Sequence, residues 1–144
     1  MIINTRDLNE AKKLILKSKR PIIMQAQNLE FNRKMLEYGK FDILLSPESS
    51  SKKDTLRQKD SGLNEILGRI ASKNSIAIGI DTNEISKLSK EEKAVRLEKI
   101  RQNIKICRKT KAKISLVNYK DKRGSIALLI SLGASTQQAK EALI

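Results

Sequence analysis

The alternation of short apolar segments with longer periodic ones is the feature that most constrains how this chain folds. Brief apolar stretches recur along the 144 residues, and the segments between them carry apolar residues at the three-and-four spacing of an amphipathic helix. Strands that are apolar throughout, alternating with helices, are typical of a mostly parallel sheet covered by helices. We expect strands over residues 2–3, 22–24, 42–46, 75–80 and 114–117.

Capping residues predict where the helices lie. We expect them over residues 6–19, from Asn28 to Gly39, from Asp60 or Ser61 through Ile70, over 90–111, over 123–132, and after a capping box of Ser135 and Gln138. A complete (β/α)₈ barrel needs eight βα units and at least ~200 residues. The sequence therefore predicts an α/β fold, an incomplete or shortened TIM-type barrel, in a single domain over residues 1–144.

The long helix over residues 90–111 has an apolar stripe and a basic face. The stripe is expected to contain Ala94, Leu97, Ile100, Ile104 and Cys107. Arg101, Lys105 and Arg108 follow the spacing of one face, away from the apolar stripe, and few acids are placed to pair with them.

The positive charge of the chain is large and concentrated. Thirty Lys and Arg against 16 Asp and Glu give a net charge of +14, whereas a small domain usually carries roughly 2–8 in magnitude. The segment between Ser86 and Arg123 contains fourteen Lys and Arg and four Asp and Glu, which gives it a net charge of +10. The plain alternative is a solvated Lys-rich surface, but a field this strong favours binding to nucleic acid.

Two further cations, Arg57 and Lys59, come just ahead of an expected helix N-terminus, where an anion is favoured. An ordinary capped helix with solvated neighbours is the alternative there. The residues expected to contact nucleic acid are Arg57, Lys59, Lys93, Arg96, Arg101, Lys105, Arg108, Lys109, Lys111, Lys113, Lys120, Lys122 and Arg123.

The residues that are missing argue against most catalytic sites. The chain has no His and one Cys, so it lacks the commonest acid/base group, a disulfide framework and a Cys-based zinc site. Cys107 is expected in the core, and the scattered glycines form no phosphate-binding loop. A metal-dependent nuclease would need clustered carboxylates, for which the candidates are Asp42, Glu48, Asp60 and Asp81. We expect no catalytic residue and no metal ligand in the protein.

The sequence also shows neither a membrane-spanning segment nor a signal peptide. The longest apolar runs have about five residues, far short of the ~18–20 that span a bilayer. The start of the chain lacks the charged and apolar regions of a signal peptide. We expect a soluble cytoplasmic protein.

Several segments, taken in order, resemble ribonuclease P protein component 3, a subunit shared by archaeal and eukaryotic ribonuclease P. A strand ending in Ser46-Pro47 is followed by a loop and helix that read Arg57-Gln58-Lys59-Asp60-Ser61-Gly62-Leu63-Asn64-Glu65-Ile66-Leu67. Residues 71–78, 96–109 and 130–140 resemble the next turn and strand, the next helix and the C-terminal segment. Good similarity covers about residues 41–84 and 96–143.

The chain departs from this family in two ways. The first βα units of the family barrel are missing, and residues 49–56 lengthen the loop. We expect a shortened member that starts naturally at Met1, with a fragment as the alternative. The apolar edge left by the missing units is expected to be covered by another protein chain or by a second copy.

The resemblance implies a role in transfer-RNA maturation. In ribonuclease P the RNA subunit is the catalyst, with Mg²⁺ held by RNA, and it removes the 5′ leader of precursor tRNA. Component 3 pairs with protein component 2 and acts with the other ribonuclease P proteins. We therefore expect a non-catalytic RNA-binding subunit. The alternatives are a metal-dependent nuclease or phosphoesterase on a barrel-like fold, and a general basic RNA-binding protein.

Overall fold

A single sheet of five parallel strands organises the chain in the computed structural model, which describes residues 2–50 and 61–143. The strands lie across the sheet in chain order and all neighbouring pairs are parallel. Their bounds are β1 (Ile2–Ile3), β2 (Ile23–Gln25), β3 (Ile43–Leu45), β4 (Ala77–Asp81) and β5 (Ile114–Val117). All five predicted strands are confirmed, two with the predicted bounds and three with ends that differ by one or two residues.

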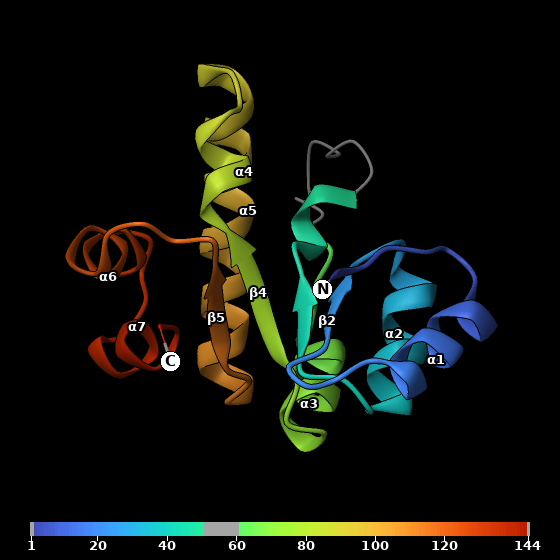
Figure 1. Ribbon diagram of the computed structural model, residues 1–144. Coiled ribbons are helices and arrows are strands. Elements are labelled where there is room, and N and C mark those ends of the chain that lie inside the picture. The colour runs from blue at the N-terminus through green and yellow to red at the C-terminus, as the bar shows by residue number, and fades with distance from the viewer. Residues whose placement is uncertain (1, 51–60, 144) are drawn as a thin grey trace.

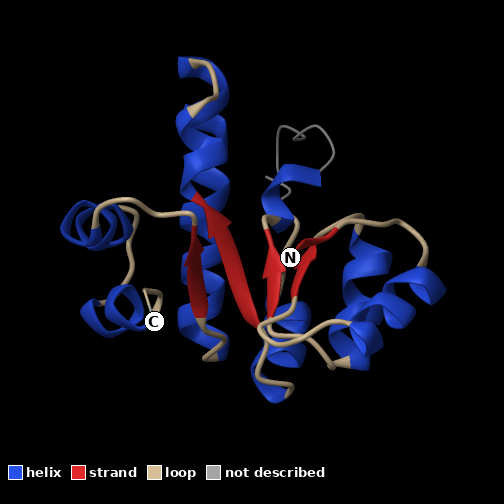
Figure 2. Cartoon of the chain, viewed as in Figure 1, coloured by secondary structure: helices blue, strands red, loops and turns tan. Residues whose placement is uncertain are grey.

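Helices follow the strands and contact one another in the same order, α1 with α2, α2 with α3, and α3 with α5 (Figure 1). The helices are α1 (Leu8–Lys17), α2 (Leu29–Tyr38), α3 (Glu65–Lys73), α4 (Thr82–Ser86), α5 (Lys90–Thr110), α6 (Lys122–Ser131) and α7 (Thr136–Glu141), with a 3₁₀ turn η1 (Pro47–Ser50) after β3. Figure 2 shows the sheet as an open layer, with α6 and α7 beyond β5. This sequential βα order with an unclosed sheet is that of an incomplete TIM-type barrel.

The parallel register places one residue from each strand in a single buried row. Ile3, Met24, Leu44, Ile78 and Ile114 are register partners across all five strands, and each is at most 4% exposed. Because successive strand residues point to opposite faces, their neighbours occupy the other face. That second row is only half covered: Ile2 is 42% exposed, and Ile23, Ile43 and Ala77 are intermediate.

Local capping explains most helix boundaries. The Asn28 side chain accepts a hydrogen bond from the Phe31 N–H, Gly39 ends α2 at φ 75°, and Ser135 and Gln138 form the expected capping box. The predicted start of α3 is wrong, because the Asn64 side chain caps this helix by accepting from the Leu67 N–H. Ser61, one of the two predicted caps, is therefore not the N-cap, and Asp60, the other, lies outside the described residues.

The connection after β4 contains the short helix α4, which is not among the predicted helices. The Asp81 carboxylate caps α4 by accepting from the N–H groups of Asn83 and Glu84. None of the helices in the described part of the chain is both long and apolar enough to cross a membrane.

The buried row predicts a sharp difference between two adjacent residues of β3. Truncating Leu44 to Ala, at the centre of the row, should lower the free energy of unfolding by about 2–5 kcal/mol, because a fully buried side chain is replaced by a cavity. Ile43→Ala on the half-covered face is the matched control and should cost clearly less. Urea unfolding followed by circular dichroism measures both, and equal losses would contradict this assignment of faces.

Candidate nucleic-acid interface

The basic face of α5 is the apolar stripe of the same helix displaced by one residue. Ile100, Ile104 and Cys107 are each 1% exposed and pack in the core. Each next residue is rotated by about 100° around the helix, which turns Arg101, Lys105 and Arg108 to the surface. All three are exposed, so packing of the stripe fixes where this row of cations lies.

Two hollows lie along this row and share Arg108. The first, of about 530 Å³, is bounded by Arg101, Lys105 and Arg108 of α5 and, across from them, by Ser131, Leu132 and Gly133 at the end of α6. The second, of about 420 Å³, continues past the end of α5, where its cations are Arg108, Lys111 and Lys113. We call the two hollows together the basic groove.

The α6–α7 segment on the far side of the basic groove is held in place by contacts to α5 and to β5. The side-chain amide of Gln138 in α7 donates to the carbonyl oxygen of Ile104 at 3.4 Å. The N–H of Leu116 in β5 donates to the carbonyl oxygen of Ala142 at 2.9 Å. The wall was missed by sequence reasoning, although residues 131–133 were part of the family resemblance, because no periodic pattern relates them to α5.

Positive charge dominates the basic groove. Five cations (Arg101, Lys105, Arg108, Lys111 and Lys113) line it, together with two carboxylates, Glu98 and Glu141. The Glu98 oxygen lies 3.9 Å from Arg101 Nε, between two side chains that are both more than half exposed. A pair of this kind is weak, so the groove keeps a net positive field that suits phosphate groups.

Other predicted cations lie outside the groove. Lys109 pairs with Glu65 of α3, with 2.6 Å between Nζ and Oε1. That hydrogen bond and the charge of Lys109 lower the pKa of the Glu65 carboxyl. Lys93 is half-buried in the first part of α5, and Lys120, Lys122 and Arg123 are exposed around the start of α6.

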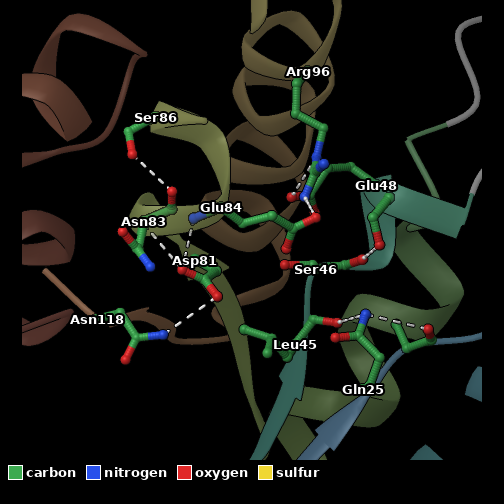
Figure 3. A network of polar contacts seen from close by, with 12 residues as sticks. Gln25, Leu45, Ser46, Glu48, Asp81, Asn83, Glu84, Ser86, Arg96 and Asn118 are labelled. Carbon is green, nitrogen blue, oxygen red and sulfur yellow. Dashed lines mark hydrogen bonds and ion pairs between the residues drawn. The ribbon is translucent and has the colours of Figure 1, made fainter. Parts of the chain in front are cut away.

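The structure gives Arg96 a different position from the other predicted contacts. Its guanidinium lies between two carboxylates, with Nε 3.3 Å from Glu48 Oε1 and Nη2 3.2 Å from Glu84 Oε1 (Figure 3). The Arg96 side chain is 11% exposed and that of Glu48 1%. Arg96 was predicted to contact nucleic acid, but its charge is paired with two carboxylates and shielded from solvent, so it does not belong to that set. It joins α5 to η1 and α4.

The Glu48 carboxyl is strongly perturbed by this setting. Burial raises its pKa above the usual range, and the charge and hydrogen bond of Arg96 offset part of that shift. An unpaired carboxylate at this position would carry a large desolvation penalty. Cys107 is likewise buried as expected, and burial raises the pKa of its thiol to about 12.

The carboxylates considered for a metal site do not converge. Asp42 precedes β3 and accepts from the Ile22 N–H and from Arg20, both at 2.6 Å, at the opposite end of the sheet from Glu48. Asp81 is the last residue of β4, where it caps α4 and accepts from the Asn118 amide at 3.3 Å. Within the described ranges no group of three His, Cys, Asp or Glu is placed to hold a metal ion. Asp60, Arg57 and Lys59 lie outside those ranges.

A close backbone approach explains the glycine of the loop before α3. Gly62 has φ 75°, and a Cβ added there would lie 2.0 Å from the carbonyl oxygen of Pro47. The amide of Asn103 in α5 donates to the carbonyl oxygen of Ser61 at 3.0 Å. This loop end is thus buried between η1 and α5, with no room for a side chain at residue 62.

The comparisons with known proteins agree with this geometry. No family model matches the chain. Ribonuclease P protein component 3 from Methanococcus maripaludis strain C6 is 29% identical over 110 residues, covering 74% of this chain and 44% of that protein. The component 3 protein of Methanocaldococcus jannaschii is 32% identical over 88 residues, covering 61% and 35%. The chain spans less than half the length of these curated relatives.

A solved structure shows the same fold. A chain in the cryo-EM structure of archaeal ribonuclease P with mature tRNA matches with a TM-score of 0.78 and 25% identity, covering 98% of this chain and 62% of that one. The resemblance to component 3 is confirmed. The chain therefore corresponds to part of that solved chain, and the five parallel strands of its open sheet are fewer than the eight of a complete barrel.

Removing the partner of Glu48 should produce a pH-dependent loss of stability. Arg96→Met should lower the free energy of unfolding by about 3–5 kcal/mol at pH 8, because a buried carboxylate loses its cation. Burial raises the pKa of Glu48, and the protonated carboxyl carries no charge that burial would penalise. The loss of unfolding free energy in Arg96→Met should therefore shrink as the pH falls toward 5. Unfolding in urea at several pH values measures this.

Two controls accompany that variant. Arg101→Met removes an exposed cation and should leave stability nearly unchanged, within about 0.5 kcal/mol. Adding Glu48→Gln to Arg96→Met should recover part of the loss and remove its pH dependence. If Arg96→Met lowered the free energy of unfolding by the same amount at pH 5 and at pH 8, this account of the Glu48–Arg96 pair would be wrong.

Alanine substitutions at Gly62 and Gly133 distinguish the cost of backbone strain from the cost of a steric clash. Both have positive φ, but a Cβ at Gly133 would meet nothing within 4 Å. Gly133→Ala should therefore cost only the conformational strain, about 1 kcal/mol, and Gly62→Ala several times more. Thermal or urea unfolding provides the comparison, and similar costs at the two sites would show that the contact with Pro47 is not limiting.

Proposed function

We propose that this chain is a non-catalytic subunit of ribonuclease P, which binds the catalytic RNA and supports removal of the 5′ leader from precursor tRNA. The observation that carries the proposal is the combined likeness, in sequence and in fold, to ribonuclease P proteins. The basic groove supplies a physical means, since a row of exposed cations neutralises RNA phosphates.

Under this proposal the RNA does the chemistry and holds the Mg²⁺ ions. The protein contributes Lys and Arg side chains that reduce repulsion between closely packed phosphates. Protein component 2 and the other ribonuclease P proteins are its expected neighbours, and the expected compartment is the cytoplasm. A pull-down from the source cells, probed for ribonuclease P RNA and component 2, tests this identity.

Charge reversal in the groove should weaken assembly with the RNA. The variant Arg101→Glu/Lys105→Glu/Arg108→Glu removes three potential phosphate contacts, and each lost contact weakens binding about threefold or more at moderate salt. Reconstituted cleavage of precursor tRNA, with the ribonuclease P RNA and its other proteins, should then need about tenfold or more of this protein to reach half-maximal rate.

A matched triple separates position from net charge. Lys13→Glu/Lys17→Glu/Lys19→Glu changes three exposed cations on and after α1, far from the groove in sequence, and alters the total charge by the same amount. It should reduce assembly much less. Equal effects of the two triples would reject the basic groove as the RNA-binding face. Cleavage of precursor tRNA by the purified chain without any RNA subunit would overturn the non-catalytic role.

A further inference from the structure

We propose that the basic groove seats the phosphate backbone of one strand of a base-paired RNA, and that it does so without reading base sequence. This inference rests on the proposed function and deepens it, because it names the form of RNA and the place where it sits.

The spacing of the cations argues for a strand laid along α5. Arg101, Lys105 and Arg108 occupy successive turns of one helix face, and they span seven residues or about 10 Å. Lys111 and Lys113 continue the row past the helix end. A line of cations of this length matches several consecutive phosphates of one strand better than it matches a single compact anion.

The shape of the basic groove favours a recessed binding site for RNA over contact with a flat surface. The end of α6 forms a wall opposite the cations, and this wall consists of Ser131, Leu132 and Gly133. Ser131 and Gly133 are small, Leu132 is 6% exposed, and a Cβ at Gly133 would meet nothing within 4 Å, so these residues leave the hollow open. An RNA backbone entering the first hollow would contact the cations of α5, with Glu98 among them, and on the opposite side the uncharged residues 131–133.

The lack of aromatic groups argues for paired bases. No aromatic residue lines either hollow. Among the described residues, Tyr119 is the aromatic side chain with substantial exposure, and its hydroxyl donates to the carbonyl oxygen of Leu143 at 2.9 Å. Proteins that hold unpaired strands rely on stacking of bases on aromatic rings. Paired RNA keeps its bases stacked internally and presents phosphates and 2′-hydroxyls, which this groove suits.

A plug in the groove tests the seat without changing charge. The purified chain is titrated into a fluorescently labelled RNA hairpin with a stem of one helical turn, and binding is followed by anisotropy. Ser131→Trp, which places a large side chain in the wall, should weaken binding by roughly tenfold or more, because several phosphate contacts are lost together. Ala127→Trp, exposed on the same helix outside the groove, is the control and should bind like the original chain.

A second variant keeps the test decisive if the plug disturbs folding. Arg108→Gln removes the cation shared by both hollows and should weaken binding about threefold or more, while the salt slope falls by about one. Lys13→Gln, exposed on α1, is its matched control. Urea unfolding of each variant establishes that the fold is retained.

The choice of RNA completes the experiment. Two hairpins with exchanged base pairs should bind within about twofold of each other, since phosphate contacts carry no sequence information. An unpaired strand of equal length should bind more weakly, and its binding should be insensitive to Ser131→Trp. Tighter binding of the unpaired strand, a clear preference between the hairpins, or equal affinities for Ser131→Trp and Ala127→Trp would each overturn the proposal.

The outcomes separate this inference from the proposed function. If Ser131→Trp binds hairpins normally while the groove charge reversal still impairs reconstituted ribonuclease P, the function stands and the seat is wrong. If the chain binds hairpins through the groove but neither assembles with ribonuclease P RNA nor supports cleavage, the seat stands and the proposed function falls.

Discussion

Packing of α5 against the sheet is the contact on which the rest of this molecule depends. Ile100, Ile104 and Cys107 bury one stripe of the helix, and that burial fixes the rotation of all 21 residues. Rotation in turn decides which cations reach solvent along the basic groove and which one, Arg96, turns inward. It also brings α5 close to α3, where a Cβ at Gly68 would lie 2.7 Å from the Thr110 hydroxyl. One apolar stripe thus positions a charged surface, a buried ion pair and a helix contact.

The sheet is open and has five parallel strands, whereas a complete TIM-type barrel has eight. Its first row of strand residues is fully buried, because helices cover that face in chain order. Its second row, from Ile2 to Ala77, is apolar yet half covered, which is the condition of a barrel interior before the sheet closes. The chain also matches only 62% of the solved ribonuclease P chain. Both observations fit an open, incomplete TIM-type barrel of five parallel strands.

Much of this architecture was readable from the sequence because the signals are local. Strands such as Ile114–Val117 are apolar runs flanked by polar residues, and caps such as Asn28, Gly39 and Ser135 act within one helical turn. Apart from the start of α3, where the local cap Asn64 was missed, the predictions failed where tertiary packing decides the outcome. Ala94 fits the stripe of α5 but is exposed, since about 31 Å of helix exceeds the ~16 Å of β4 and its first turns extend past the sheet (Figure 1). Arg96 reads as one more basic residue until Glu48 and Glu84 are folded around it.

The sequence alone determined the βα order, the concentration of charge on one long helix and the family resemblance, because periodicity, composition and motifs are properties of contiguous residues. Only the tertiary structure decided which of those charges are available. Whether a cation faces solvent, a carboxylate or a hollow depends on segments that meet through packing, as residues 131–133 meet Arg101 and Arg108 across the basic groove. The same folding turned a scattered set of carboxylates into caps and ion pairs with separate partners, at opposite ends of the sheet.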